Sequence, residues 1–243
     1  VQERQEVDRI LASLSAQVGA AAEDIITGIG ALARLDVAMA KAYYAEKARA
    51  IEPEISKVPN TRMLRLVNAR HPLLRGDVVP LSLEIGGDFN VLIISGPNAG
   101  GKTVALKTIG LLVLMAQAGL PIPCAEGTVM PVYDNVFADI GDEQSIEATL
   151  STFSAHIRNI AHVVKDSTPD SLVLLDELGI STDPGEGAAL AQATLTHFVG
   201  KGTNVVVTTH YSELKAFAHL TNGVRNASMD FDPVTLAPSY HLS

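Results

Sequence analysis

Residues 96–103 read Gly-Pro-Asn-Ala-Gly-Gly-Lys-Thr, and no other segment constrains the fold of this chain as strongly. The segment fits the pattern G-x-x-x-x-G-K-[ST], follows the apolar run at residues 91–94 and precedes a stretch of helical composition. A buried strand, a glycine-rich turn and a helix in this order are the context of a phosphate-binding loop, or P-loop. The backbone N–H groups of such a loop and the positive end of its helix surround phosphate oxygens. The sequence therefore predicts an α/β domain that binds a nucleotide.

The last two residues of the P-loop have separate expected roles. We expect the Lys102 amine to reach the β- and γ-phosphates of ATP and the Thr103 hydroxyl to bind Mg²⁺. The whole loop supplies the candidate nucleotide-binding residues, which are Gly96, Pro97, Asn98, Ala99, Gly100, Gly101, Lys102 and Thr103.

Two adjacent acids follow a second apolar run at residues 172–175, in the manner of a Walker B strand. Burying two carboxylates is costly unless a cation or polar partners meet them. We expect Asp176 to join Thr103 as a Mg²⁺ ligand and Glu177 to polarise the attacking water. Thr208-Thr209-His210 ends a third predicted buried strand, and we expect His210 to contact the γ-phosphate. Lys102, Glu177 and His210 are the candidate catalytic residues, and ATP and Mg²⁺ are the expected substrate and cofactor.

The first 51 residues have a different pattern from the rest of the chain. Apolar side chains recur there at steps of three or four, which is typical of a helix, and Gly19, Gly28 and Gly30 weaken the pattern. We therefore expect one kinked or broken helix, or two stacked helices. The apolar stripe either packs against the rest of this molecule or belongs to a long lever or coiled coil. We expect a helical segment over residues 1–52 and a P-loop ATPase domain over residues 53–243.

Strands and helices alternate after the linker at residues 52–59. Strands are predicted at 63–68, 78–85, 90–95, 172–175 and 204–209, with two more in 224–240 joined by a turn near 232–233. Helices are predicted at 103–118, 143–165, 186–199 and 212–219, the last with Ser212 as its N-cap, whereas 120–131 reads as irregular. This alternation predicts a mostly parallel sheet flanked by helices. The P-loop, the Asp-Glu pair and the following histidine together indicate a P-loop NTPase of the ATP-binding-cassette type.

Composition excludes several classes of protein. The net charge is −9, with 18 Lys and Arg against 27 Asp and Glu, so a basic nucleic-acid grip is not expected in this chain. The apolar runs are too short to cross a bilayer, so no membrane partner is expected. One cysteine excludes a disulfide framework within the chain, and the start of the sequence lacks the pattern of a secretion signal. The default expectation is a cytoplasmic protein.

The sequence resembles the ATPase domain of the MutS superfamily, and within it the second bacterial branch. The resemblance covers nearly the whole chain and rests on residues 70–74, 96–103, 119–120, 122–123, 139–146, 150–156, 175–179, 182–184, 186–191, 208–211 and 226–228. Residues 35–37 and 40–42 resemble the end of the lever helices of the family. The block at residues 139–156 distinguishes this branch from the mismatch-repair branch.

The resemblance implies a homodimeric ATPase with two composite sites, each completed by Ser151 and Thr152 of the partner copy. It places Asp183 at the same interface and Val78 and Val79 beside the adenine. Full-length relatives bind branched DNA, restrain homologous recombination and are implicated in rescuing stalled ribosomes. Many also carry an Smr nuclease domain, which this chain is expected to lack as an ATPase fragment.

One departure and two alternatives accompany the resemblance. Ser181 stands where the family usually has glycine, which puts the switching geometry of that loop in doubt. A transporter cassette would carry L-S-G-G-Q between the Walker motifs, and this chain does not. A nucleotide-gated structural module of the SMC type, with incidental turnover, is the other alternative, and Glu177 argues against it.

Overall fold

The computed structural model describes residues 2–56, 62–97, 100–141, 149–179, 183–232 and 237–243. The chain divides into two compact units, Val1–Lys47 and Ala48–Ser243, and each is described by itself. The described residues form six helices and two sheets, a mixed α/β architecture.

Two helices make up the first part of the chain. They are α1 (Gln2–Ala20) and α2 (Ala22–Ala48), interrupted at Ala21, so a broken helix is confirmed. The three glycines expected to weaken it lie inside the helices, and the break follows Gly19 by two residues. No described residue of either helix is buried. The apolar stripe is exposed along its length, as Leu32 shows at 65% exposure. None of the helices in the described part of the chain combines the length and apolar character needed to cross a membrane.

A six-stranded sheet forms the centre of the second unit. Its strands lie in the order β10 (Ala237–Leu242), β9 (Val224–Asp232), β4 (Val91–Ser95), β8 (Asn204–Thr209), β7 (Leu172–Leu175) and β6 (Val136–Asp139). The pairs from β9 to β6 are parallel, and only β10 is antiparallel to its neighbour. The mostly parallel sheet and the two-stranded tail are therefore confirmed.

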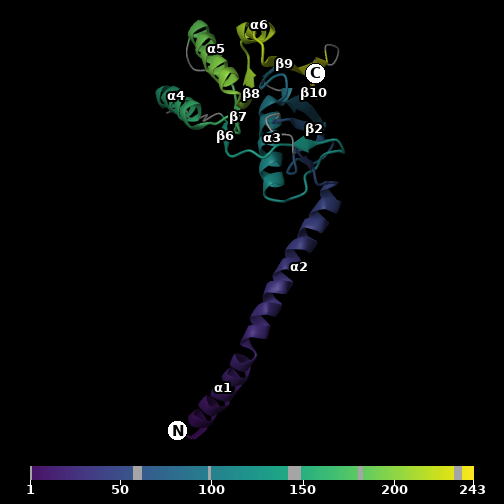
Figure 1. Ribbon diagram of the computed structural model, residues 1–243, viewed down its shortest axis with the longest axis vertical. Helices are drawn as coiled ribbons and strands as arrows, with labels where there is room; N and C mark the ends of the chain where they lie inside the picture. Colours follow the sequence, from purple (N-terminus) through teal and green to yellow (C-terminus); the bar gives the residue numbers. More distant parts are fainter. Residues whose placement is uncertain (1, 57–61, 98–99, 142–148, 180–182, 233–236) are drawn as a thin grey trace. The chain divides into compact units, whose positions relative to one another are not determined.

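Helices cover both faces of this sheet because alternate residues of its strands point in opposite directions. Leu92 and Ile94 of β4 share one core with the inner face of α3 (Lys102–Gln117). Val91 and Ile93 share the other core with α4 (Thr149–Asp166), α5 (Pro184–Lys201) and α6 (Ser212–Leu220). In Figure 1 these three helices lie together, apart from α3.

A smaller sheet packs into the α3 side of the core. Its strands lie in the order β1 (Glu54–Ile55), β5 (Val129–Met130), β2 (Leu64–Ala69) and β3 (Leu81–Ile85). Leu64, Leu66 and Ile85 from this sheet are buried together with Leu106 and Ile109 of α3. The smaller sheet thus packs against α3, the helix that follows the P-loop.

The structure corrects four local predictions. The strand expected at 78–85 begins only at Leu81, directly after Pro80, which has no N–H to donate to a ladder. The region 120–131 contains β5, whose two residues are too few to show a period. β6 was not predicted, because this edge strand has no buried residue and lacks the continuous four-residue apolar run that marked β7. Ser212 is the first residue of α6 rather than its N-cap, a position held by Tyr211 without a side-chain bond.

Candidate functional site

The candidate residues meet because their strands are neighbours in a parallel sheet. β4, β8 and β7 lie side by side, with Ile94 paired to Thr208 and Leu175 paired to Val207. The carboxyl ends of all three strands therefore lie at one edge of the sheet. The P-loop, the Asp176–Glu177 pair and His210 leave the sheet at this edge.

The amine of Lys102 lies inside the P-loop. Lys102 is 2% exposed, and its Nζ donates hydrogen bonds to the carbonyl oxygens of Gly96 at 2.7 Å and Pro97 at 3.0 Å. Burial lowers the pKa of this amine, and the nearby carboxylates of Glu177 and Asp176 act in the opposite direction. A phosphate that entered the loop would therefore meet the Lys102 amine already held inside it. Asn98 and Ala99, both predicted to bind nucleotide, lie outside the described residues.

Gly101 closes the loop at the N-cap of α3. Its φ of +88° lies in the left-handed region, where glycine is favoured because it has no Cβ. A Cβ at this position would lie 3.1 Å from the Tyr240 ring. Both the backbone conformation and the close Tyr240 ring therefore favour glycine at this position.

Asp176 is held between two threonine hydroxyls. Thr103 donates to Asp176 Oδ2 at 2.7 Å, and Thr208 donates to Asp176 Oδ1 at 2.5 Å. Mg²⁺ is usually bound by hard oxygen ligands from one or two protein groups together with phosphate oxygens and water. The carboxylate of Asp176 and the hydroxyl of Thr103 form such an oxygen pair, so the residues present fit the predicted metal.

Glu177 and His210 form a second pair beside the first. His210 Nε2 lies 2.8 Å from Glu177 Oε1, and because an ionised carboxylate can only accept, the imidazole N–H donates. The Glu177 side chain is 25% exposed, so water can reach it. Glu177 also has φ of +53°, which is uncommon for a residue with a side chain. The expected contact of His210 with a γ-phosphate stays a prediction, and in this structure its partner is Glu177.

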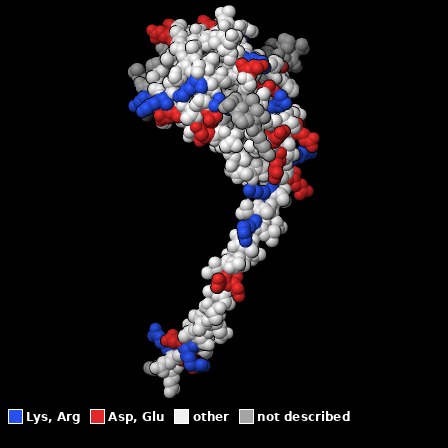
Figure 2. Space-filling model, in the orientation of Figure 1, with Lys and Arg blue, Asp and Glu red and all other residues white. Residues whose placement is uncertain are grey.

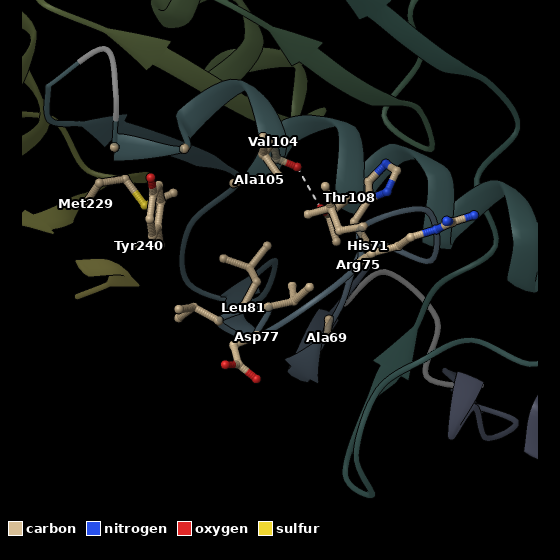
Figure 3. Close-up of a pocket in the computed structure, with 15 residues that line it drawn as sticks. Ala69, His71, Arg75, Asp77, Leu81, Val104, Ala105, Thr108, Met229 and Tyr240 are labelled. Atoms are coloured by element: carbon tan, nitrogen blue, oxygen red, sulfur yellow. Dashed lines mark hydrogen bonds between the residues drawn. The ribbon is translucent and has the colours of Figure 1, made fainter. Parts of the chain in front are cut away.

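A pocket of about 400 Å³ adjoins the P-loop. Val78 and Val79 line it together with Gly100 and Gly101, so the structure brings the expected adenine residues next to the loop. Figure 3 shows the pocket between α3, which contributes Val104, Ala105 and Thr108, and the small sheet, which contributes Ala69 and Leu81. A third side is made by Met229 and Tyr240.

The residues expected to act in the partner copy lie at the starts of two helices. Ser151 and Thr152 are in the first turn of α4, and their expected role stays a prediction. Asp183 is the N-cap of α5, where its Oδ1 accepts a hydrogen bond from the Gly185 N–H at 2.9 Å. Ser181 lies outside the described residues.

Sequence reasoning missed Thr208, Tyr240 and Met229 as parts of the site. Thr208 stood in the Thr208-Thr209-His210 motif at the end of a predicted buried strand, and this strand-end position was the available signal. No local pattern pointed to Tyr240 or Met229, because their approach to the P-loop depends on β9 pairing with β4 and β10 pairing with β9.

Comparison with known proteins gives one family. The family model described as MutS domain V matches residues 92–239. The chain is 53% identical over 240 residues to an Endonuclease MutS2 of Pelotomaculum thermopropionicum, covering 99% of this chain and 30% of the relative. It is 52% identical over 244 residues to an Endonuclease MutS2 of a Geobacillus species, strain WCH70, covering 100% of this chain and 31% of the relative.

A third relative, the Endonuclease MutS2 of Clostridioides difficile, is 51% identical over 241 residues, which are 99% of this chain and 30% of the relative. The chain thus spans about 30% of the length of these relatives. The match to domain V covers more than half of the chain and includes the P-loop, the Asp-Glu pair and His210. The chain therefore belongs to the MutS family and carries its ATPase domain.

Proposed function

We propose that this chain hydrolyses ATP to ADP and phosphate in a site of the ATP-binding-cassette type. The observation that carries the proposal is the convergence of Lys102, the Thr103–Asp176 pair and the Glu177–His210 pair at one sheet edge. A site that only held a nucleotide would not need an acid beside the metal ligand, so the second pair supports turnover.

The phosphate end of the site neutralises charge. The Lys102 amine binds the β- and γ-phosphate oxygens, exchanging the carbonyl oxygens of Gly96 and Pro97 for stronger acceptors. Thr103 and Asp176 hold Mg²⁺. The bound metal supplies further neutralisation of the charge that develops on the phosphates.

The water end of the site is built around Glu177. Its carboxylate accepts a hydrogen bond from the attacking water and so orients it. The hydrogen bond from His210 fixes the direction of the carboxylate. The exposure of Glu177 leaves room for that water. The bond between His210 and Glu177 supports the proposal that His210 links the carboxylate to the γ-phosphate.

The adenosine end lies in the pocket beside Gly101. Val78 and Val79 supply apolar surface for the adenine, and the pocket adjoins the loop that holds the phosphates. Its volume of about 400 Å³ lies within the range of small-molecule sites.

The working unit is a homodimer in which Ser151 and Thr152 of one copy complete the site of the other. The family supports this arrangement, as does the place of both residues at the positive end of α4. Dimerisation would couple the nucleotide state to DNA held mainly by parts of the protein beyond this chain. For the whole protein we propose suppression of homologous recombination through branched DNA, and action on stalled ribosomes.

Replacing Lys102 tests the phosphate end. Lys102→Ala removes the cation from the loop floor, so affinity for a fluorescent ATP analogue and steady-state turnover should both collapse while the melting temperature holds. Lys165→Ala, on the exposed side of α4, is the matched control and should leave both unchanged. ATP binding of wild-type strength in Lys102→Ala would contradict the assignment.

Mixing two inactive variants tests the composite site. Lys102→Ala damages a site in cis, and Ser151→Ala is expected to damage a site in trans. In a mixed dimer one site carries both changes and the other carries neither, so phosphate release should partly return when the two proteins are combined. Ser151 is the third residue of α4, so if it served only its own helix, Ser151→Ala would change the free energy of unfolding and leave turnover per folded dimer intact. That result would remove the trans role.

A further inference from the structure

Thr208 has one hydroxyl that contacts both acids of the site. Its Oγ1 donates to Asp176 Oδ1 at 2.5 Å and accepts a hydrogen bond from the Glu177 N–H at 2.8 Å. Thr208 is fully buried, so no water competes for these bonds. Its own carbonyl oxygen accepts the Leu178 N–H at 3.3 Å, which ties the same residue to the next position of the loop.

These bonds fix two features of the residues that follow β7. The carboxylate of Asp176 has one oxygen on Thr208, so its other oxygen is directed toward Thr103. Glu177 has φ of +53°, a conformation of about 1–3 kcal/mol above ordinary backbone when the surroundings do not enforce it. The bond from its N–H to Thr208 Oγ1 holds the residue in that conformation.

We propose that Thr208 is a positioning residue that sets the metal ligand Asp176 and the water-orienting residue Glu177 in one fixed relation. This inference rests on the proposed ATPase function. It explains how Asp176 stays a metal ligand while Glu177 orients water. When Thr103 turns to a metal ion, the bond to Thr208 remains and prevents the Asp176 carboxylate from rotating. The backbone bond does the same for the chain at Glu177, and so for the direction of its side chain toward His210.

The chemistry requires a hydroxyl, because the group must donate to one neighbour and accept from the other. Valine has nearly the same shape and can do neither, whereas serine keeps the hydroxyl and loses one methyl group. Thr203 offers a matched control. It is also fully buried, it directly precedes β8, the strand that contains Thr208, and its hydroxyl donates to the Thr168 carbonyl oxygen at 2.8 Å.

The experiment compares Thr208→Val, Thr208→Ser and Thr203→Val in the 243-residue chain. Three quantities are measured: Mn²⁺ affinity of the ADP-bound protein by electron paramagnetic resonance, kcat and KM for ATP, and exchange of the Glu177 amide hydrogen. Loss of a group that orients a metal ligand typically lowers metal affinity or activity by about 10–100-fold. We expect such a loss of Mn²⁺ affinity and of kcat in Thr208→Val, faster exchange at Glu177, and little change in KM for ATP.

Thr208→Ser should restore most of both losses, and Thr203→Val should show neither. Thr208→Ala, which removes the hydroxyl without adding a methyl group, replaces Thr208→Val if the valine variant does not fold. Wild-type Mn²⁺ affinity and exchange in the hydroxyl-free variant would overturn the inference, as would equal losses in Thr203→Val. If wild-type protein failed to hydrolyse ATP, the proposed function would fall, and the Mn²⁺ and exchange measurements would still decide the role of Thr208.

Discussion

Buried polar side chains occupy both ends of β8, and each end has its own partner. Thr208 serves the candidate site, whereas Asn204 lies at the opposite end with 1% exposure. The Asn204 amide donates to the Tyr133 hydroxyl oxygen at 2.9 Å and to the Arg62 carbonyl oxygen at 2.8 Å. Burial raises the pKa of the Tyr133 phenol well above its ordinary value of 10.0. This end of the strand therefore contributes stability that depends on pH.

The sign of that dependence follows from which state releases the proton. The native state keeps Tyr133 protonated, while the unfolded chain loses the proton near pH 10. Above that pH the unfolded state binds fewer protons, so the free energy of unfolding falls as pH rises. The contribution of Tyr133 is fully present below pH 10 and declines above it.

Tyr133→Phe isolates this contribution. Removing the hydroxyl takes one acceptor from Asn204 and should cost about 1 kcal/mol at neutral pH. The variant should also lose less stability than wild type between about pH 8 and pH 11, since the titrating phenol is gone. Urea denaturation across that range measures both, and Tyr43→Phe, at an exposed tyrosine, is the control. If the free energy of unfolding fell equally with pH in wild type and Tyr133→Phe, the buried phenol would have no part in this pH dependence.

Most of the candidate site could be predicted from the sequence because its residues sit in short motifs at strand ends. Lys102, Asp176, Glu177 and His210 each follow a continuous apolar run, and parallel strands bring such ends together. Tyr240 could not be predicted in the same way. Its ring reaches Gly101 only through the pairing of β10 with β9 and of β9 with β4, which no local pattern encodes.

At the scale of elements, the start of α5 is pressed against the loop that follows Glu177. A Cβ on Gly187 would lie 2.3 Å from the Gly179 carbonyl oxygen, which no real contact allows. The same carbonyl oxygen accepts a hydrogen bond from the Tyr211 hydroxyl at 2.9 Å. The position of α5 and the course of this loop are therefore coupled through a backbone contact that only glycine permits.

Two alanine substitutions in the same helix should act in opposite directions. Gly187→Ala forces α5 away from the loop, so we expect about 1–3 kcal/mol of destabilisation, typical of overpacking, together with lower turnover. Gly200→Ala has nothing within 4 Å of its new Cβ and should stabilise the chain by about 0.5–1 kcal/mol through helix propensity. Chemical denaturation and phosphate release measure both, and a stable, fully active Gly187→Ala would refute the coupling.

The length and regularity of an element decided whether it could be predicted. α3, α5, β7 and β8 lie within a few residues of their predicted bounds, because long periodic or continuous apolar runs bury a whole face. β1 and β5 have two residues each and exist through their pairing with each other. Such strands carry no period of their own, so only the tertiary structure reveals them.

For the molecule as a whole, acidic residues outnumber basic ones. The chain carries 18 Lys and Arg against 27 Asp and Glu. On the face shown in Figure 2, basic side chains lie among acidic ones instead of forming one basic patch. Phosphate backbones are bound mainly by clustered basic side chains. This distribution agrees with the proposal that the chain itself holds DNA weakly.

The strand order of the central sheet belongs to this scale and was not predictable from the chain alone. Consecutive strands β7 and β8 are neighbours, but β4 lies between β8 and β9, far apart from either in sequence. The sequence indicated that these strands are buried and parallel, but it did not indicate which strands are neighbours in the sheet. Placement of β4 in the middle is what puts the P-loop beside both His210 and the end of β9.

The central claim is that Glu177 makes this chain hydrolyse ATP rather than merely hold it. The most direct test measures ATP binding and single-turnover phosphate release on the same samples of wild type, Glu177→Gln and the control Glu213→Gln, an exposed acid of α6. We expect Glu177→Gln to bind ATP as wild type does and to release phosphate about 10²–10⁴-fold more slowly. Phosphate release by Glu177→Gln at the rate of wild type and Glu213→Gln would contradict it.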